Sequence, residues 1–375
     1  MHDFFRKSIQ LRKLIFILIS VFLGFSSRAD TAPVSSVFDL LTGQEIVEVT
    51  LRTDLGQLLA QAEATPTYQS GLFSFSPPGQ GSQSWNIKVK ARGKFRRQVC
   101  DFPPLMLNFS RVELENRGFS GHDKLKLVTH CAEDRIVGNE KVLREYLAYQ
   151  LYRELSPYSY RVQLVSIQYI DSKGLVSGFK RLGFIIEDTD EMAERLQGEE
   201  CDDCQYRPVA AFDQQAAGIH AMFQYLIGNA DYSVPVLRNV KVVRRTLDQK
   251  LVPVGYDFDF SGLVEASYAI PANYLGQLAV RQRIYLGPLT ADADMKQQIE
   301  LFFAKKETLL RVVDNFKKLS SPARYDIREY LLNFYEQMQM IRDTGYHNVY
   351  QRLRQEHPTA VPDGGTAADY GVVSK

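Results

Sequence analysis

The chain has 375 residues, of which 45% are hydrophobic and 24% are charged. These fractions are typical of a globular protein. The formal net charge of +1 gives no support to a role at nucleic acid or at a membrane surface, so we expect no nucleic-acid partner.

The first 29 residues have the pattern of a signal peptide. Basic residues precede an apolar run at 14–25, and Ser27 and Ala29 place small residues where a signal peptidase cleaves. The apolar run is too short to cross, as a helix, a bilayer about 30 Å thick. An uncleaved membrane anchor is the alternative. We expect an exported protein, periplasmic or extracellular, with no transmembrane segment after cleavage.

The next part of the chain is predicted to be rich in strands. The alternation of apolar and polar residues and the β-branched content predict strands at 45–52, 85–91, 105–109, 161–170 and 181–186. The stretch 62–84 contains several Pro and Gly residues and predicts a long loop or a hairpin connection. Between these strands, leucine recurs every four residues over 139–155, which predicts one helix that stops at Pro157.

The second half is predicted to be mainly helical. An apolar stripe predicts a helix over 213–227, with Asp213 as its N-cap and Gly228 after its end. Long helical patterns follow at 291–319 and 322–355. The segment between these helices is the one that could carry chemistry.

An even number of cysteines in an exported chain favours disulfides. Cys100, Cys131, Cys201 and Cys204 allow three pairings. We favour Cys100 with Cys131 and Cys201 with Cys204, because the last two are close enough in sequence to pair locally. A redox motif and half of a zinc site are the alternatives for Cys201 and Cys204.

A predicted hairpin brings polar residues together. Strands at 240–244 and 251–256 flank a polar turn around Asp248. Folding the chain symmetrically about this residue places Asn239 opposite Asp257 at the open end of the hairpin. A register slip of one residue would exchange the faces but would keep the two residues close to each other.

Further acids arrive at the same end of the hairpin. Asp231 follows the end of the preceding helix, and Asp259 lies two residues beyond Asp257. Carboxylates packed together repel one another and favour a bound cation, and hard oxygen ligands suit magnesium or manganese. The alternative is structural: an acidic turn at Asp257–Asp259 and a simple helix stop at Asp231.

Several short motifs between residues 85 and 262 occur in the order of a known family. They are ARGKFRR at 91–97, CDFPPL at 100–105, LREYLAYQL at 143–151, GFIIE at 183–187, GNAD at 228–231 with Arg238-Asn239, and GYDFD at 255–259. Together they resemble the CotH kinase family, named for a spore-coat protein H that is an atypical protein kinase. The chain would be a divergent, exported member.

The resemblance implies a role for each matching residue. Asp231 would be the catalytic aspartate, which orients the acceptor hydroxyl. Asn239 and Asp257 would hold Mg or Mn between the phosphates of ATP. Asp259 would be a second metal ligand or a structural acceptor.

The resemblance also implies a fold. It predicts an α+β, bilobal, protein-kinase-like domain over 30–356, with a strand-rich N-terminal lobe at about 37–190 and a mainly helical C-terminal lobe at about 205–356. Nucleotide would bind between the lobes. The remaining segment, 357–375, is rich in Gly, Ala and Pro and is predicted to be disordered.

The cation that pairs with the nucleotide phosphates in kinases has no obvious counterpart. Met106 stands on the strand where the resemblance places a basic residue. Arg92, Lys94 and Glu187 are our candidates for the nucleotide pocket. The substitutes that remain open are Lys88, Lys90, Arg96 and Arg97 for the cation and Glu145 for its acidic partner.

Three functions follow from these residues. The first is phosphoryl transfer from a nucleotide to a hydroxyl of a protein or glycan. The second is a catalytically silent relative that acts as a binding or structural module at the cell surface or in a periplasm. The third is a metal-dependent hydrolase that uses the carboxylates without a nucleotide.

Overall fold

The computed structural model describes residues 35–62 and 65–355. The predicted signal peptide at 1–29 and the predicted disordered tail at 357–375 lie outside these residues. Among the described helices, none combines the length and the apolar character that crossing a membrane requires.

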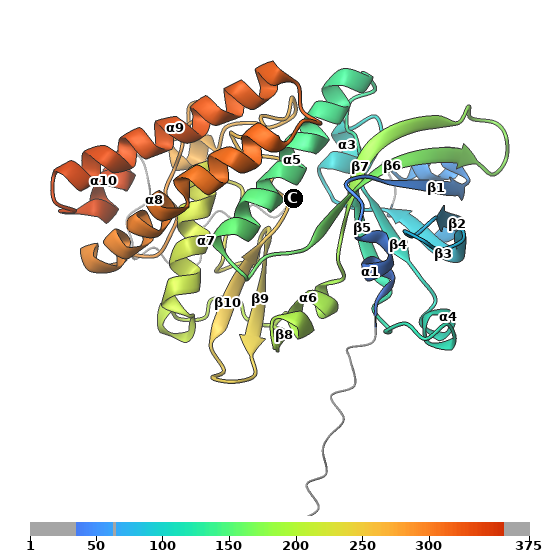
Figure 1. The fold of residues 1–375 in the computed structure, drawn as a ribbon, viewed down its shortest axis with the longest axis horizontal. Helices are drawn as coiled ribbons and strands as arrows, with labels where there is room; N and C mark the ends of the chain where they lie inside the picture. The colour runs from blue at the N-terminus through green and yellow to red at the C-terminus, as the bar shows by residue number, and fades with distance from the viewer. Residues whose placement is uncertain (1–34, 63–64, 356–375) are drawn as a thin grey trace, which may run out of the picture. The chain divides into compact units, whose positions relative to one another are not determined.

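Seven strands of the described chain form a closed barrel in the order β1-β2-β3-β4-β5-β7-β6 (Figure 1). The strands are β1 Val47–Thr53, β2 Gln69–Phe75, β3 Gln83–Ala91, β4 Leu105–Asn108, β5 Lys124–Val128, β6 Val162–Asp171 and β7 Phe179–Ile186. The pair β1–β6 is parallel and closes the barrel, and the other neighbouring pairs are antiparallel.

The alternation of side chains along each strand fills the barrel. In β1 and β3, buried residues alternate with exposed or half-buried ones, as a sheet with one face in the core requires. Leu51, Phe73, Leu107 and Ile167 come from different strands and are fully buried in one interior cluster. The barrel interior is therefore a packed core and leaves binding to its outer face and ends.

A second, smaller sheet and the longer helices lie outside the barrel. This sheet has the order β10-β9-β8, with β8 Gly198–Glu200, β9 Val240–Arg245 and β10 Leu251–Gly255. The longer helices of the described chain are α5 Arg135–Leu155, α7 Gln214–Ile227, α8 Asp292–Asn315 and α9 Ser321–Asp343. The shorter ones are α1 Val37–Leu41, α2 Leu55–Leu59, α3 Arg96–Val99, α4 Arg111–Asn116, α6 Thr189–Arg195 and α10 Val349–Gln355.

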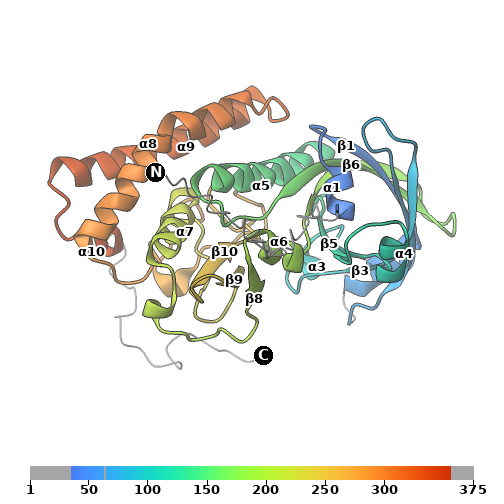
Figure 2. The same cartoon turned by 60° about the horizontal axis from the view of Figure 1, so that its bottom comes forward.

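Helix α5 connects the barrel with the helical part of the chain. It packs against β6 and β7 on one side and against α7 and α8 on the other (Figure 2). Its Leu143, Leu147 and Leu151 are buried in a core shared with α7, α8 and α9. Because α5 contacts both the barrel and the other long helices, the residues on its remaining face can contact side chains from either of them.

The expectation of a bilobal, protein-kinase-like fold is wrong. The strands close into a barrel with one parallel pair, and a separate small sheet joins the helices, which is a barrel-containing α+β fold. Strand β2 lies within the stretch 62–84, which we predicted to be a long loop or a hairpin connection, and we predicted no strand where β5 lies. Both are needed to close the barrel, so a sheet without them looks like an open strand-rich lobe.

Both predicted disulfides are confirmed, Cys100 with Cys131 and Cys201 with Cys204. The first joins the end of α3 to the connection between β5 and α5. Beside it, the backbone N–H of Asp101 donates to the carbonyl of Cys131 at 2.9 Å. This link fixes α3 close to the start of α5.

The two disulfides should differ in their contribution to stability. Replacing Cys100 and Cys131 together by Ala should lower the free energy of unfolding by about 3 to 4 kcal/mol, because that disulfide closes the longer loop. Replacing Cys201 and Cys204 together should cost about 2 kcal/mol. Urea unfolding of the purified variants measures both values, and the reverse order would contradict this account.

Candidate functional site

The β9–β10 hairpin has a register one residue away from the predicted one. Gly255 pairs with Val240, and the N–H of Tyr256 donates to the carbonyl of Asn239 at 3.1 Å. The turn between Arg245 and Lys250 has an even number of residues, so the hairpin axis does not pass through a single residue. The slip keeps Asn239 next to the segment that carries the acids, as a one-residue slip must.

Asp231 and Asn239 are in direct contact. The side-chain amide of Asn239 donates to the carboxylate of Asp231 at 2.9 Å and to its carbonyl at 2.7 Å. The Nε of Arg238 lies 3.4 Å from the other carboxylate oxygen. Because the nitrogen of the Asn239 amide is used on Asp231, its oxygen is left for another partner.

The segment Asp257–Asp259 is anchored by its middle residue. Phe258 is fully buried and its ring lies 4.7 Å from that of Tyr149 on α5. The Tyr149 hydroxyl also accepts the N–H of Asp257 at 2.9 Å. Asp257 has φ 61° and Asn239 has φ 51°, a conformation that Asp and Asn tolerate better than most residues. Backbone strain at both candidate ligands is consistent with a functional constraint.

A buried arginine connects the barrel side of the site with these acids. The Nη1 of Arg96 lies 3.5 Å from Glu145 of α5 and 3.7 Å from Asp259. Its Nη2 donates to the carbonyl of Thr129 at 3.0 Å, and the hydroxyl of Tyr268 donates to Asp259 at 2.9 Å. Of the cations and acids that the sequence left open, the structure pairs Arg96 with Glu145.

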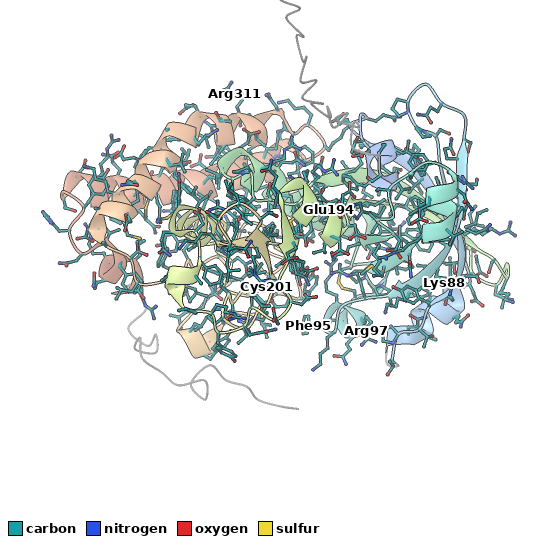
Figure 3. The ribbon with its side chains drawn as sticks, turned by 90° about the horizontal axis from the view of Figure 1, so that it is seen from below. Lys88, Phe95, Arg97, Glu194, Cys201 and Arg311 are labelled. Atoms are coloured by element: carbon teal, nitrogen blue, oxygen red, sulfur yellow. A yellow bond between two sulfur atoms is a disulfide. The ribbon has the colours of Figure 1, made fainter. Side chains whose placement is uncertain are left out.

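Aromatic packing holds α3 against the acidic segment. The ring of Phe95, the residue before Arg96, lies 5.3 Å from Phe260 and 6.2 Å from Tyr268. In Figure 3, Phe95 lies between Cys201, which is beside the second sheet, and Lys88 of the barrel. These contacts of Phe95 hold the neighbouring Arg96 close to the segment that carries Asp259.

Burial raises the pKa values of the carboxyl groups in this cluster. Burial, followed by the charge of Asp257, raises the pKa of Asp259 to about 7. Burial raises the pKa of Glu145 well above its usual value, although the charge of Arg96 opposes the shift. The pKa of Asp231 is also raised, by burial and then by Asp257. Asp257 therefore acts on the other three acids, which places all four in one electrostatic environment.

The arrangement fits a cation held by few protein ligands. Among the described residues, the side chains of Asp257 and Lys94 have no hydrogen bond or ion pair, and the amide oxygen of Asn239 has none. The acids do not form a preformed triad of ligand atoms within 4.8 Å; in the described chain that distance is met by Cys201, Asp203 and Cys204. Magnesium commonly binds through one or two protein oxygens, waters and substrate phosphates.

The group of Cys201, Asp203 and Cys204 has a different chemistry. The two sulfurs are bonded to each other, so neither is a thiolate that could bind zinc. The guanidinium of Arg244 lies 3.0 Å from the sulfur of Cys201. In this disulfide form the group closes a loop beside β9 and is not a metal centre.

The three residues predicted to bind nucleotide lie in different places. Arg92 is half-buried after β3. Burial raises the pKa of Glu145 and of Tyr149, and the positive charge of Arg92 opposes this rise. Lys94 is exposed in the loop before α3. Glu187 is fully buried and accepts hydrogen bonds from Arg161 and Arg195. Of the three, Arg92 is the one whose charge reaches the acids.

Sequence reasoning missed Lys126 on β5. Lys126 pairs with Met106 on the neighbouring strand, so the two side chains share a face of the barrel. Its ammonium donates to the hydroxyl of Thr189 at 2.6 Å. Burial, and then the charge of Arg92, lowers the pKa of Lys126 to about 8. The alternation in the segment 124–128 was the available signal, but the segment is only one short strand.

Lys126 and Tyr256, the residue before Asp257, share charged neighbours. The charges of Arg92, Lys241 and Glu200 act on the pKa of Lys126 and also on that of Tyr256, the residue before Asp257. Arg92 is the barrel cation that acts on both groups.

Comparison of the chain with family models and with curated proteins finds no match in either case.

The raised pKa of Asp259 predicts a specific pH dependence of stability. An acid with a higher pKa in the folded protein holds its proton more tightly there, so this stabilisation is present at low pH and is lost as the pH rises through about 7. When the pH is raised from about 4 to about 8, the free energy of unfolding should fall by about 2 to 4 kcal/mol more in the wild type than in Asp259→Asn.

Denaturant unfolding at several pH values measures this difference. The exposed Asp294→Asn is the matched control, and its pH profile should follow that of the wild type. Parallel profiles for Asp259→Asn and the wild type would show that Asp259 titrates like an ordinary surface acid.

Proposed function

We propose that this protein is an exported, metal-dependent phosphotransferase that moves a phosphoryl group from a nucleotide such as ATP to a hydroxyl of a protein or glycan. The contact of Asp231 with Asn239, beside Asp257, carries the proposal. The motif resemblance to the CotH kinase family supports this activity, and membership of that family is part of the proposal.

Asp231 is the residue that would orient the acceptor hydroxyl. Its carboxylate is held by Asn239 and Arg238, so its direction is fixed. Burial and the neighbouring Asp257 raise its pKa, which makes the carboxylate a better proton acceptor than a surface aspartate. Phosphoryl transfer depends mainly on such positioning and on charge neutralisation.

The remaining charged groups would hold the nucleotide. Asn239 and Asp257 offer oxygens to Mg or Mn, and the bound cation would neutralise charge on the transferred phosphate. On the barrel side, Arg92 and Lys126 are the cations suited to the other phosphates. Lys126 loses part of its hydration through burial, so an anion beside it restores favourable electrostatics.

Export of the protein is supported by its disulfides. Disulfides persist in secreted and periplasmic proteins and are rare in the cytosol. Cys100–Cys131 and Cys201–Cys204 together use every cysteine of the chain. The acceptor would therefore be a protein or glycan outside the cytoplasm.

A catalytically silent binding or structural module is the second candidate. Arg96 pairs with Glu145 and Asp259, and Tyr268 donates to Asp259, all inside the protein. Such a network holds the acidic segment in place without any nucleotide. In that case the same fold would serve binding alone.

Nucleotide binding distinguishes the two candidates. Thermal unfolding of the mature protein should shift upward by several degrees with ATP and MgCl2 or MnCl2 in excess, because a ligand of the folded state stabilises it. Metal alone and ATP with EDTA are the controls. An unchanged melting temperature with every common nucleoside triphosphate would favour the silent module.

Two substitutions separate chemistry from binding. Asp231→Asn should reduce transfer at least about 100-fold and leave nucleotide affinity unchanged, because the residue acts on the acceptor. Asp257→Asn should weaken metal-dependent nucleotide binding at least about tenfold. Asp294→Asn should change neither. Transfer to a casein or glycan acceptor, followed with labelled ATP, reports the first value; full activity of both variants would remove this site.

The barrel cation gives a third test. Lys126→Met should weaken ATP binding about tenfold, and Lys126→Arg should retain most of the affinity, because the charge is what the phosphate needs. Lys88→Met, which changes a cation on another strand of the barrel, should have no effect (Figure 3). Titration calorimetry with ATP and Mg measures all three, and equal affinity for Lys126→Met and Lys88→Met would exclude Lys126 from the phosphate site.

A further inference from the structure

A chain of buried polar side chains lies behind Asp231. The N–H of Asp231 donates to the side-chain oxygen of Asn229 at 2.9 Å. The amide of Asn229 donates to the side-chain oxygen of Gln224 at 2.9 Å, and the nitrogen of that glutamine lies 3.1 Å from the Nε2 of His220. Asn229, Gln224 and His220 are each at most 1% exposed.

The direction of every hydrogen bond in this chain follows from one unambiguous donor. A backbone N–H can only donate, so Asn229 must accept from Asp231 with its oxygen and must donate with its nitrogen. Gln224 then accepts with its oxygen and donates with its nitrogen. His220 must therefore accept at Nε2, which requires a neutral ring with its proton on Nδ1. Burial agrees with this state, because it lowers the pKa of His220 to about 3.

The helix end fixes the same residues through the backbone. Gly228 takes the left-handed conformation with φ 64° at the end of α7, and the N–H of Asn229 donates to the carbonyl of Gln224 at 2.9 Å. This is the hydrogen bond of a Schellman motif, which sets the direction in which the chain leaves the helix. Asn229 is thus held to Gln224 by backbone and side chain together.

The hairpin strand that leads to Asp257 also rests on these side chains. A Cβ atom at Gly255 would lie 2.8 Å from the side-chain nitrogen of Gln224 and 3.1 Å from the Nε2 of His220. Only glycine lets β10 approach the pair this closely. The segment that carries Asp231 and the strand that leads to Asp257 therefore both pack against the Gln224–His220 pair.

We propose that His220, Gln224 and Asn229 are positioning residues, which set the backbone of Asp231 so that its carboxylate meets the acceptor hydroxyl. This inference rests on the proposed function of Asp231. Apolar side chains could pack at these three positions without the desolvation cost of polar groups. Here the hydrogen bonds of each residue offset that cost. The polar chain ends at Asp231, so what it adds beyond packing is the orientation of that residue.

The protonation of His220 tests the chain in the ligand-free protein. With 15N-labelled histidine, NMR should show His220 as the neutral Nδ1–H form, with Nε2 as an acceptor, from about pH 5 to about pH 8. A His220 that carries its proton on Nε2, or that titrates near the ordinary value of about 6.5, would overturn the chain. This result does not depend on any catalytic activity.

Substitution of the central glutamine tests positioning. Gln224→Met keeps the length of the side chain but cannot donate to His220 or accept from Asn229. In the ligand-free protein, hydrogen exchange of the Asp231 amide should become at least about tenfold faster relative to amides in the middle of α7. Ile219→Val, a buried substitution on the same helix that removes no member of these hydrogen bonds, is the control for general destabilisation and should leave that ratio unchanged.

Kinetics complete the test. Gln224→Met should lower kcat at least about tenfold with little change in KM for ATP, whereas Ile219→Val should change neither. Equal kcat values for Gln224→Met and the wild type would overturn the positioning role. If the wild type shows no transfer at all, the proposed function fails, while the histidine and amide-exchange measurements still decide whether the chain orients Asp231.

Discussion

The candidate site depends on one buried positive charge. Arg96 is only 7% exposed, and its guanidinium lies between Glu145 and Asp259, which are themselves buried. Without it, two carboxyl groups would face each other in a region of low dielectric, where ionised carboxylates are very unfavourable. The raised pKa values of both acids show that the arginine compensates their burial only in part.

This charge also joins parts of the chain that are far apart in sequence. Arg96 begins α3, which the Cys100–Cys131 disulfide ties to the start of α5, and Glu145 lies nearly three turns further along α5. Asp259 follows the hairpin, and its neighbour Phe258 is buried against the same helix. Helix α5 is therefore the common support: it presents Glu145 to the arginine and Tyr149 to the backbone of Asp257. The acids are therefore held against α3 and α5 by contacts that require no ligand.

Local sequence patterns predicted many of the helices, strands and disulfides. The features that they did not predict depend on pairing between distant segments of the chain. Helix α7 and the β9–β10 hairpin follow from caps and turn residues. The short separation of Cys201 and Cys204 predicts their disulfide, which leaves Cys100 and Cys131 as the second pair. The barrel does not, because its closing step pairs Val47–Thr53 with Val165–Asp171 in parallel, and no local pattern specifies a partner so distant. The register of the hairpin was wrong by one residue because polar turn residues do not reveal how many of them the turn uses.

The candidate site likewise combines local contacts, which the sequence can predict, with contacts between distant elements, which it cannot. Asp231, Asn239 and Asp257 are near one another along a helix end and one hairpin, so their meeting could be predicted. Arg96 and Glu145 could only be named among several candidates, since a contact between different elements decides the pair. Lys126 was missed because its strand was missed. Glu187 was chosen by motif, but Arg161 and Arg195 occupy both of its oxygens.

A crystal structure with Mn and a non-hydrolysable ATP analogue tests the central claim most directly. We expect an anomalous peak about 2 to 2.5 Å from the Asp257 carboxylate and the Asn239 amide oxygen. A peak elsewhere, or an ordered nucleotide away from Asp231, would contradict the claim.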